Sequence, residues 1–149
     1  MKFEHAARVE ASPDAVFALT QDYALRLTWD PFLTRAQLIG GATAPAVGVR
    51  AWCVAKGGIG METEYVTFAR PRLVAVKMTK GPWPLETFGG AWEFVPDGAG
   101  TCVLFRYQFR TRPRWLAWAI EPIARAWFSR ETRLRVAALE RAIAAGAGR

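Results

Sequence analysis

The sequence between residues 10 and 32 reads EASPDAVFALTQDYALRLTWDPF and predicts two short helices. Ser12 can cap the first helix with its side-chain oxygen, and Pro13 suits the first helical position. We expect this helix to end near Asp22. A second helical segment is expected over residues 24–28. The Trp-Asp-Pro that follows should stop it, because proline cannot continue a helix.

Strand-like segments lie on both sides of these helices. Residues 3–11 alternate apolar and polar side chains, which is typical of a half-buried strand. Further along, tight turns such as PDGAG at residues 96–100 separate the strand-like runs. Short connections of this kind favour an antiparallel sheet over strand–helix–strand units. The downstream strands are predicted over residues 35–39, 47–55, 60–68, 73–79, 87–95 and 101–111.

A long helical run from Pro113 to Ala145 follows the last predicted strand. Apolar residues recur in it at helical spacing and form one stripe, which we expect to face the sheet. Pro122 lies inside the run and predicts a kink or a broken first turn. The predicted stripe comprises Leu116, Ala119, Ile120, Ile123, Trp127, Leu134, Ala137 and Ala138.

The order of these elements predicts an α+β fold. A strongly curved antiparallel sheet of about seven strands would wrap around the C-terminal helix, and the two short helices after the first strand would close one end. The middle of such a sheet need not be filled by side chains, so the architecture suits storage of a small molecule. No repeat, low-complexity segment or linker interrupts residues 1–149, and we expect a single domain.

The segment EASPDAVFAL, followed by Tyr23 and by Trp29-Asp30-Pro31-Phe32, resembles the opening of the SRPBCC superfamily. That group includes the START, Bet v 1 and polyketide cyclase/dehydrase-like proteins. The resemblance extends to the strand order and the C-terminal helix, so it covers nearly the whole chain. It implies the helix-grip fold with a pocket for a lipid- or polyketide-like molecule. It does not imply one activity, because members bind lipids, hormones or polyketides, act as cyclases, or have no known ligand.

The composition fits a folded protein that binds apolar molecules. Hydrophobic residues make up 52% of the 149 residues and charged residues 22%, which argues against disorder. The seven Trp and nine Phe can fill a core or line a pocket. The net charge of +7 favours anionic partners such as a membrane surface. Because the basic residues are spread along the chain, we expect no nucleic-acid partner.

The sequence offers little metal-binding chemistry. Cys53 and Cys102 lie far apart inside predicted strands and are expected to be buried free thiols. His5 is the single histidine, so we expect no metal and no other cofactor. The first residues show no apolar leader, and the apolar run over residues 115–128 is too interrupted to span a bilayer. We therefore expect a cytoplasmic protein.

Several aromatic side chains are candidates for a pocket wall. Strand alternation places Trp92 and Tyr107 on the inner face, where they wall a pocket or serve as ordinary core aromatics. Arg130 lies in the predicted helix stripe and can anchor an anionic head group or extend to solvent. The predicted ligand-binding residues are Trp29, Trp52, Trp92, Tyr107, Ile123, Trp127 and Arg130.

Two residues are candidates for acid–base catalysis. His5 falls on the inner parity of the first strand, and imidazole titrates near neutral pH; the alternative is a histidine near the surface at a strand end. Glu64 and its neighbour Glu62 face the cavity if Phe68 does. The opposite parity, with Tyr65 inward, leaves both carboxylates in water. The sequence does not decide between the two.

Three functions remain open at this stage. The first is binding or carrying a hydrophobic small molecule, which needs a pocket and no catalytic pair. The second is a polyketide cyclase or dehydrase that uses His5 or Glu64 as an acid or base. The third is lipid transfer with membrane docking, because Trp115, Trp118 and Phe128 fall off the predicted stripe among arginines. Those aromatics can equally cover the sheet rim or form a homodimer contact.

Overall fold

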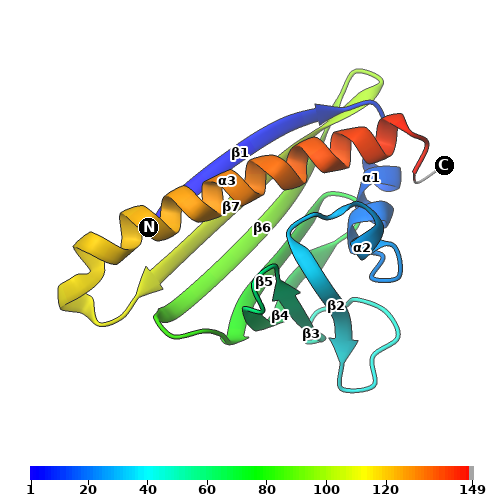
Figure 1. The fold of residues 1–149 in the computed structure, drawn as a ribbon. Coiled ribbons are helices and arrows are strands. Elements are labelled where there is room, and N and C mark those ends of the chain that lie inside the picture. Colours follow the sequence, from blue (N-terminus) through cyan, green and yellow to red (C-terminus); the bar gives the residue numbers. More distant parts are fainter. Residues whose placement is uncertain (148–149) are drawn as a thin grey trace.

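Seven strands form one antiparallel sheet in the order β1-β7-β6-β5-β4-β3-β2 (Figure 1). The computed structural model describes residues 1–147. The α+β class predicted from the sequence is confirmed. The elements are β1 (Lys2–Val9), α1 (Pro13–Gln21), α2 (Arg26–Trp29), β2 (Leu33–Ile39), β3 (Arg50–Ala55), β4 (Gly60–Ala69), β5 (Leu73–Lys80), β6 (Leu85–Asp97), β7 (Gly100–Thr111), the 3₁₀ helix η1 (Arg114–Leu116) and α3 (Ala117–Ala144).

The first short helix forms as its sequence predicts. The Ser12 side-chain oxygen accepts a hydrogen bond from the backbone N–H of Ala15 at 3.2 Å, and Pro13 occupies the first helical position. Helix α2 begins two residues later than expected, at Arg26. Asp22 explains the delay, because its Oδ1 accepts hydrogen bonds from the backbone of Ala24 and Leu25 and holds this segment in a turn.

Helix α3 crosses the sheet on its concave side and packs mainly on β1 and β7 (Figure 1). Phe128 of α3 lies in an aromatic cluster, with its ring centroid 5.4 Å from Phe88, 5.5 Å from Phe109 and 6.3 Å from Phe3. Sequence reasoning placed Phe128 off the core stripe, and the structure corrects this. These contacts fix the helix against the two strands at one edge of the sheet.

The buried face of α3 differs from the predicted stripe. Ile123 is 73% exposed and Leu134 is also exposed, although both were expected to face the sheet. The inward residues instead form two adjacent rows with a spacing of four. A spacing of four gives rows inclined to the helix axis, so the predicted straight stripe is only partly right: Ile120 and Trp127 lie in the rows and Ala138 is buried. The rows are Ile120-Ala124-Phe128-Thr132-Val136 and Trp127-Glu131-Arg135-Leu139-Ile143.

Strand β4 changes the face of its side chains within its length. Tyr65 pairs with Val76 and Thr67 pairs with Ala75, so Val66 is an extra residue in a β-bulge. Tyr65 and Phe68 both reach the interior on the two sides of this bulge, with their ring centroids 5.7 Å apart. Strict alternation through the strand is therefore broken at residue 66.

Candidate functional site

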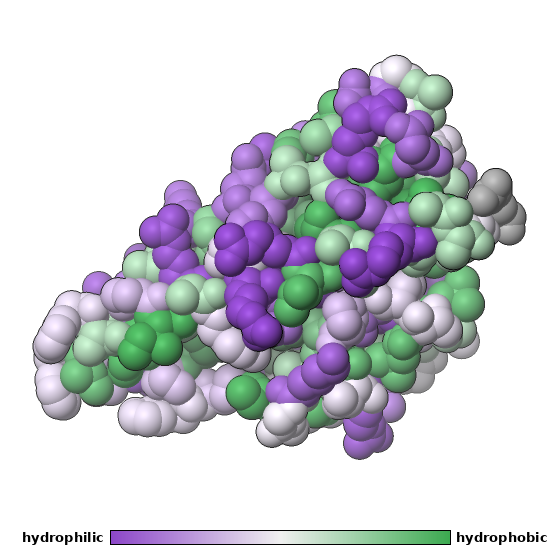
Figure 2. All heavy atoms as spheres, turned by 45° about the horizontal axis from the view of Figure 1, so that its top comes forward, coloured by the Kyte–Doolittle hydropathy of each residue, from purple (hydrophilic) through white to green (hydrophobic). Residues whose placement is uncertain are grey.

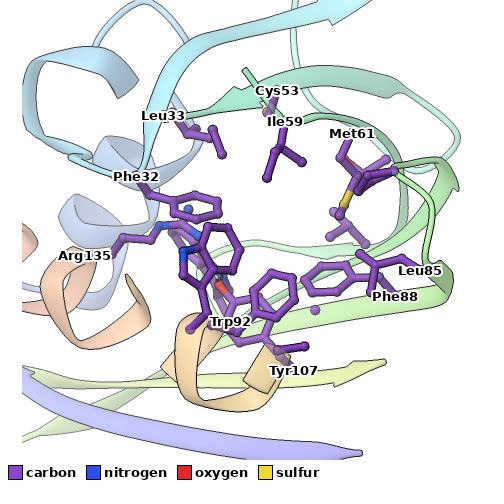
Figure 3. Close-up of a pocket in the computed structure, with 18 of the residues that line it drawn as sticks. Phe32, Leu33, Cys53, Ile59, Met61, Leu85, Phe88, Trp92, Tyr107 and Arg135 are labelled. Atoms are coloured by element: carbon purple, nitrogen blue, oxygen red, sulfur yellow. Dashed lines mark hydrogen bonds between the residues drawn. The ribbon is translucent and has the colours of Figure 1, made fainter. Parts of the chain in front are cut away.

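A cavity of about 250 Å³ lies between the sheet and α3. Figure 3 shows side chains from β2 to β7, from the loop before β2 and from α3 that converge on this hollow. One end is mainly apolar, because aliphatic, thioether and aromatic side chains predominate there. Its wall is formed by Leu33, Ile59, Met61, Leu85 and Phe88.

The other end of the cavity is cationic. Arg26 of α2 and Arg135 of α3 both line it, and each side chain is buried. Asp30 lies behind them with a fully buried side chain. Its Oδ2 accepts hydrogen bonds from Arg26 Nε at 2.8 Å and from Arg135 Nε and Nη2 at 3.1 and 2.9 Å. Two guanidinium groups therefore share one carboxylate.

The charges of this cluster are stable at neutral pH. Burial raises the pKa of Asp30, but Arg135 and Arg26 more than offset this, so the pKa lies below its ordinary value. Burial likewise opposes the charge of Arg26, yet Asp30, Tyr23 and Cys53 raise its pKa overall. Asp30 stays anionic and Arg26 cationic across the physiological range.

Aromatic rings surround the two guanidinium groups. The Trp92 ring contacts both, with its centroid 4.6 Å from Cζ of Arg26 and 5.2 Å from Cζ of Arg135. Phe32 lies 5.1 Å from Arg135 in the same way. The Tyr107 hydroxyl accepts hydrogen bonds from Trp92 Nε1 at 3.0 Å and from Arg135 Nη1 at 3.4 Å. Its own proton is then free to donate into the cavity.

A second polar group on the wall is a pair of tyrosines. The Tyr65 hydroxyl donates to Gln21 Oε1 at 2.9 Å and lies 2.8 Å from the Tyr23 hydroxyl. Burial raises the pKa of both tyrosines and that of the nearby Cys53 thiol. These groups are therefore neutral hydrogen-bonding groups at pH 7 and not nucleophilic anions.

Three of the predicted ligand-binding residues meet at the cavity, namely Trp92, Tyr107 and Trp127. Trp29 is buried against Arg26 outside the lining, and its Nε1 has no hydrogen-bond partner within residues 1–147. Trp52 is also outside the lining, beside Gly60.

Two predicted residues of α3 point away from the cavity. Ile123 lies on the outer side of the helix, so the expectation that it walls the pocket is corrected. The Arg130 side chain is 69% exposed and pairs with Glu131 at 3.1 Å. Both follow from the inclined rows of the helix, which turn residues 123 and 130 to solvent.

The structure places neither catalytic candidate in the cavity lining. His5 is half-buried on β1, where its Nε2 lies 2.7 Å from Ser129 Oγ of α3. Glu64 pairs with Lys77 at 3.3 Å on the opposite face of β4 from Thr63 and Tyr65, which line the cavity. The bulge at residue 66 is the reason, because the inward side chain of Phe68 does not set the parity of residues 62 and 64.

Sequence reasoning missed the charged cluster. Asp30 stands in the quoted Trp-Asp-Pro, but nothing local distinguishes it from a turn residue. Arg135 stands among other charged residues, including Glu131, Arg133 and Glu140, so nothing in the sequence distinguishes it from a solvent-exposed arginine. Its partner is 105 residues away in the chain.

Three further observations bear on the site. Cys53 and Cys102 are free thiols, but each is only half-buried. Within residues 1–147, no group of three or more His, Cys, Asp or Glu side chains is arranged to hold a metal ion. In the same part of the chain, no helix is both long and apolar enough to cross a membrane.

A curved antiparallel sheet that holds a long helix, with a cavity between the two, is the helix-grip architecture. This chain belongs to the family described as "Polyketide cyclase / dehydrase and lipid transport", whose pattern matches residues 1–144. The family assignment confirms the resemblance to SRPBCC and Bet v 1-like proteins. No curated protein sequence matches the chain.

Solved structures share the fold at low sequence identity. A protein from Thermus thermophilus is 16% identical, with a TM-score of 0.80 over 98% of this chain and 99% of the other. Norcoclaurine synthase from Thalictrum flavum, solved with dopamine and hydroxybenzaldehyde, is 14% identical, with a TM-score of 0.70 over 98% of this chain and 87% of the other. The di-domain ARO/CYC protein BexL of the BE-7585A pathway is 19% identical, with a TM-score of 0.74 over 96% of this chain and 46% of the other.

Proposed function

We propose that this protein binds a hydrophobic small molecule in the cavity between the sheet and α3. The observation that carries the proposal is the wall itself, where aromatic and aliphatic side chains from the sheet and the helices enclose about 250 Å³ around a few convergent polar groups. Membership of a family that includes ligand-binding proteins and polyketide cyclases supports it. An aromatic ligand that buries about 300 Å² of apolar surface gains about 7 kcal/mol before the costs of association.

Replacing each of two alanines of α3 by phenylalanine tests this proposal. Ala124 lines the cavity, and Ala126 is exposed on the same helix. Ala124→Phe should fill the cavity and weaken binding of the fluorescent probe N-phenyl-1-naphthylamine by about tenfold or more, whereas Ala126→Phe should leave it unchanged. Fluorescence titration gives the affinities, and native mass spectrometry of the purified protein reports any retained ligand. Equal binding by both variants would place the probe elsewhere and contradict the proposal.

Docking at an anionic membrane is a second candidate, and an exposed apolar patch favours it. Trp115 is 76% exposed, Trp118 78% and Ile123 73%. In Figure 2, the left end of the molecule, where α3 begins in Figure 1, is mostly pale with two hydrophobic groups, whereas the centre is strongly hydrophilic. Ile120, close by on α3, lines the cavity, so the patch borders the route by which a lipid would enter.

Catalysis of a cyclase or dehydrase type has less support. An enzyme of this kind needs a general base near the bound substrate. His5 and Glu64 lie outside the cavity lining, and burial keeps Tyr23, Tyr65 and Cys53 protonated. Binding without chemistry is therefore the function that the site supports best.

A further inference from the structure

The cationic end of the cavity contains more positive charge than its partners neutralise. The cavity wall carries two arginines, and among the residues that line it there is no Asp or Glu. Asp30 behind them balances one of the two charges, and Glu131, one helical turn before Arg135, pairs with the exposed Arg130 instead. One net positive charge therefore faces a buried apolar space, and an uncompensated buried charge is costly.

The hydrogen bonds of the two arginines leave donors available. Asp30 Oδ2 takes three of their bonds, the Thr20 carbonyl takes one from Arg26 Nη1, and Tyr107 takes one from Arg135. Guanidinium groups carry more N–H donors than these bonds use. Within the described part of the chain, Nη2 of Arg26 makes no hydrogen bond. The Tyr107 hydroxyl accepts hydrogen bonds from Trp92 and Arg135, so its own proton is one more donor that an acceptor in the cavity can bind.

The protein stabilises this excess charge with aromatic faces instead of a second carboxylate. The Trp92 ring contacts both guanidinium groups, and Phe32 contacts Arg135 (Figure 3). Cation–π contacts lower the cost of the buried charge without occupying the hydrogen-bond donors. An anion that enters the cavity would therefore find unused donors, an uncompensated charge and a low-dielectric surrounding.

We propose that the cavity selects apolar ligands that carry one acidic oxygen function, either a carboxylate or an ionised phenol or enol. Arg26 and Arg135 bind the oxyanion, Tyr107 donates a further hydrogen bond, and the ring system or chain lies at the end formed by Ile59, Met61, Leu85 and Phe88. This inference rests on the proposed function and adds the chemical class of the ligand.

A matched pair of ligands separates the two proposals. 2-Naphthoate is an anion at pH 7, and 2-naphthamide has nearly the same shape without the charge. Isothermal titration calorimetry should show that the wild-type protein prefers the naphthoate by about tenfold or more. Equal affinities would overturn this inference and leave the proposed function intact. Binding of neither compound, together with no binding of N-phenyl-1-naphthylamine, would overturn both.

Substitutions of the arginines test whether Arg135 causes the preference for the naphthoate. Arg135→Met leaves Arg26 and Asp30 as a balanced pair and should reduce the preference to about threefold or less while retaining naphthamide binding. Arg135→Lys retains the charge and should retain a preference. Arg133→Met removes an exposed arginine of the same helix and should change neither affinity. An unchanged preference in a folded Arg135→Met variant would overturn the assignment.

A spectroscopic measurement needs no variant and remains decisive if Arg135→Met does not fold. The spectrum of 7-hydroxycoumarin distinguishes the phenol from the phenolate, so titration of the bound dye gives its pKa. A cationic site lowers the pKa of the bound hydroxyl below the value in water, whereas a neutral apolar pocket raises it. A raised pKa of the dye bound to the wild-type protein would overturn the inference.

Discussion

At the scale of single residues, Asp30 is a charged side chain that is fully buried and therefore depends on its hydrogen-bond partners. Its fully buried carboxylate accepts hydrogen bonds from two arginines through Oδ2 and from the backbone N–H of Phe32 through Oδ1 at 3.0 Å. It thereby joins the α2 segment to α3. Removing one member of such a cluster leaves buried charges without a partner.

Asp30→Asn should therefore lower the free energy of unfolding by about 3–5 kcal/mol, as measured by urea denaturation. Asp97→Asn, which removes an exposed carboxylate paired with Arg8, is the matched control and should cost about 1 kcal/mol or less. A loss below about 1 kcal/mol in Asp30→Asn would show that the cluster does not contribute to stability.

The same carboxylate predicts a pH dependence. The pKa of Asp30 is lower in the folded chain than in the unfolded chain. Its stabilisation is therefore complete above the unfolded pKa of about 4 and is lost as the pH falls toward the folded pKa. Urea midpoints between pH 7 and pH 3 should fall steeply for the wild type below pH of about 4, and less steeply for Asp30→Asn.

His5 allows a direct measurement, because it is the only histidine. Burial lowers its pKa, and Arg133 lowers it further, so its NMR resonance should titrate below the ordinary value of about 6.5. Arg133→Met should move the pKa upward, since it removes the second cause. A wild-type pKa at or above about 6.5 would contradict the half-buried position beside Ser129.

At the scale of elements, η1 and the start of α3 carry exposed aromatic side chains next to the part of α3 that lines the cavity. The inward rows line the cavity, whereas Trp115 and Trp118 extend into solvent just after Arg112 and Arg114. Aromatic and basic side chains on one surface suit an anionic bilayer interface. The patch and the cavity wall are thus formed by successive turns of one helical segment.

Vesicle flotation tests the docking candidate. The wild type should float with vesicles of phosphatidylserine and phosphatidylcholine, and high salt should weaken this. Each arginine near the membrane surface contributes about 1 kcal/mol to the free energy of binding. The double substitution Trp115→Ala/Trp118→Ala removes buried apolar area and should reduce flotation by about tenfold or more. Leu134→Ala, an exposed apolar residue further along α3, is the control. Equal and negligible flotation of wild type and double variant would leave the tryptophans as a contact with another protein surface.

At the scale of the whole molecule, the cavity results from how α3 meets the sheet. The helix packs mainly on β1 and β7, while β2 to β5 curve away from it and leave unfilled space (Figure 1). An unfilled apolar space forgoes packing that a close-packed core would have. A ligand that fills it should therefore stabilise the entire fold.

Thermal unfolding with a ligand in excess measures this linkage. At a free concentration of about 100 times Kd, a bound ligand adds about 2.7 kcal/mol to the free energy of unfolding. N-phenyl-1-naphthylamine should therefore raise the Tm of the wild type by a few degrees, and at the same concentration it should raise that of Ala124→Phe by about half as much or less. A wild-type Tm that does not respond to a saturating ligand would contradict binding in the core of the fold.

Local patterns were sufficient for the secondary structure and the fold class. The cap at Ser12, the alternation in β1, β6 and β7 and the glycine-rich turn before β7 each act through residues close in sequence, so the antiparallel sheet and the terminal helix could be predicted. Trp92 and Tyr107 were placed correctly on the inner face for the same reason.

The charged end of the cavity required the tertiary structure. Asp30 and Arg135 are 105 positions apart, and no local pattern pairs them. The bulge at Val66 shifts strand parity through pairing with β5, and the inward rows of α3 depend on the angle at which the helix crosses the sheet. These features arise from contacts between distant segments, whereas periodicity and capping are properties of neighbours in the chain.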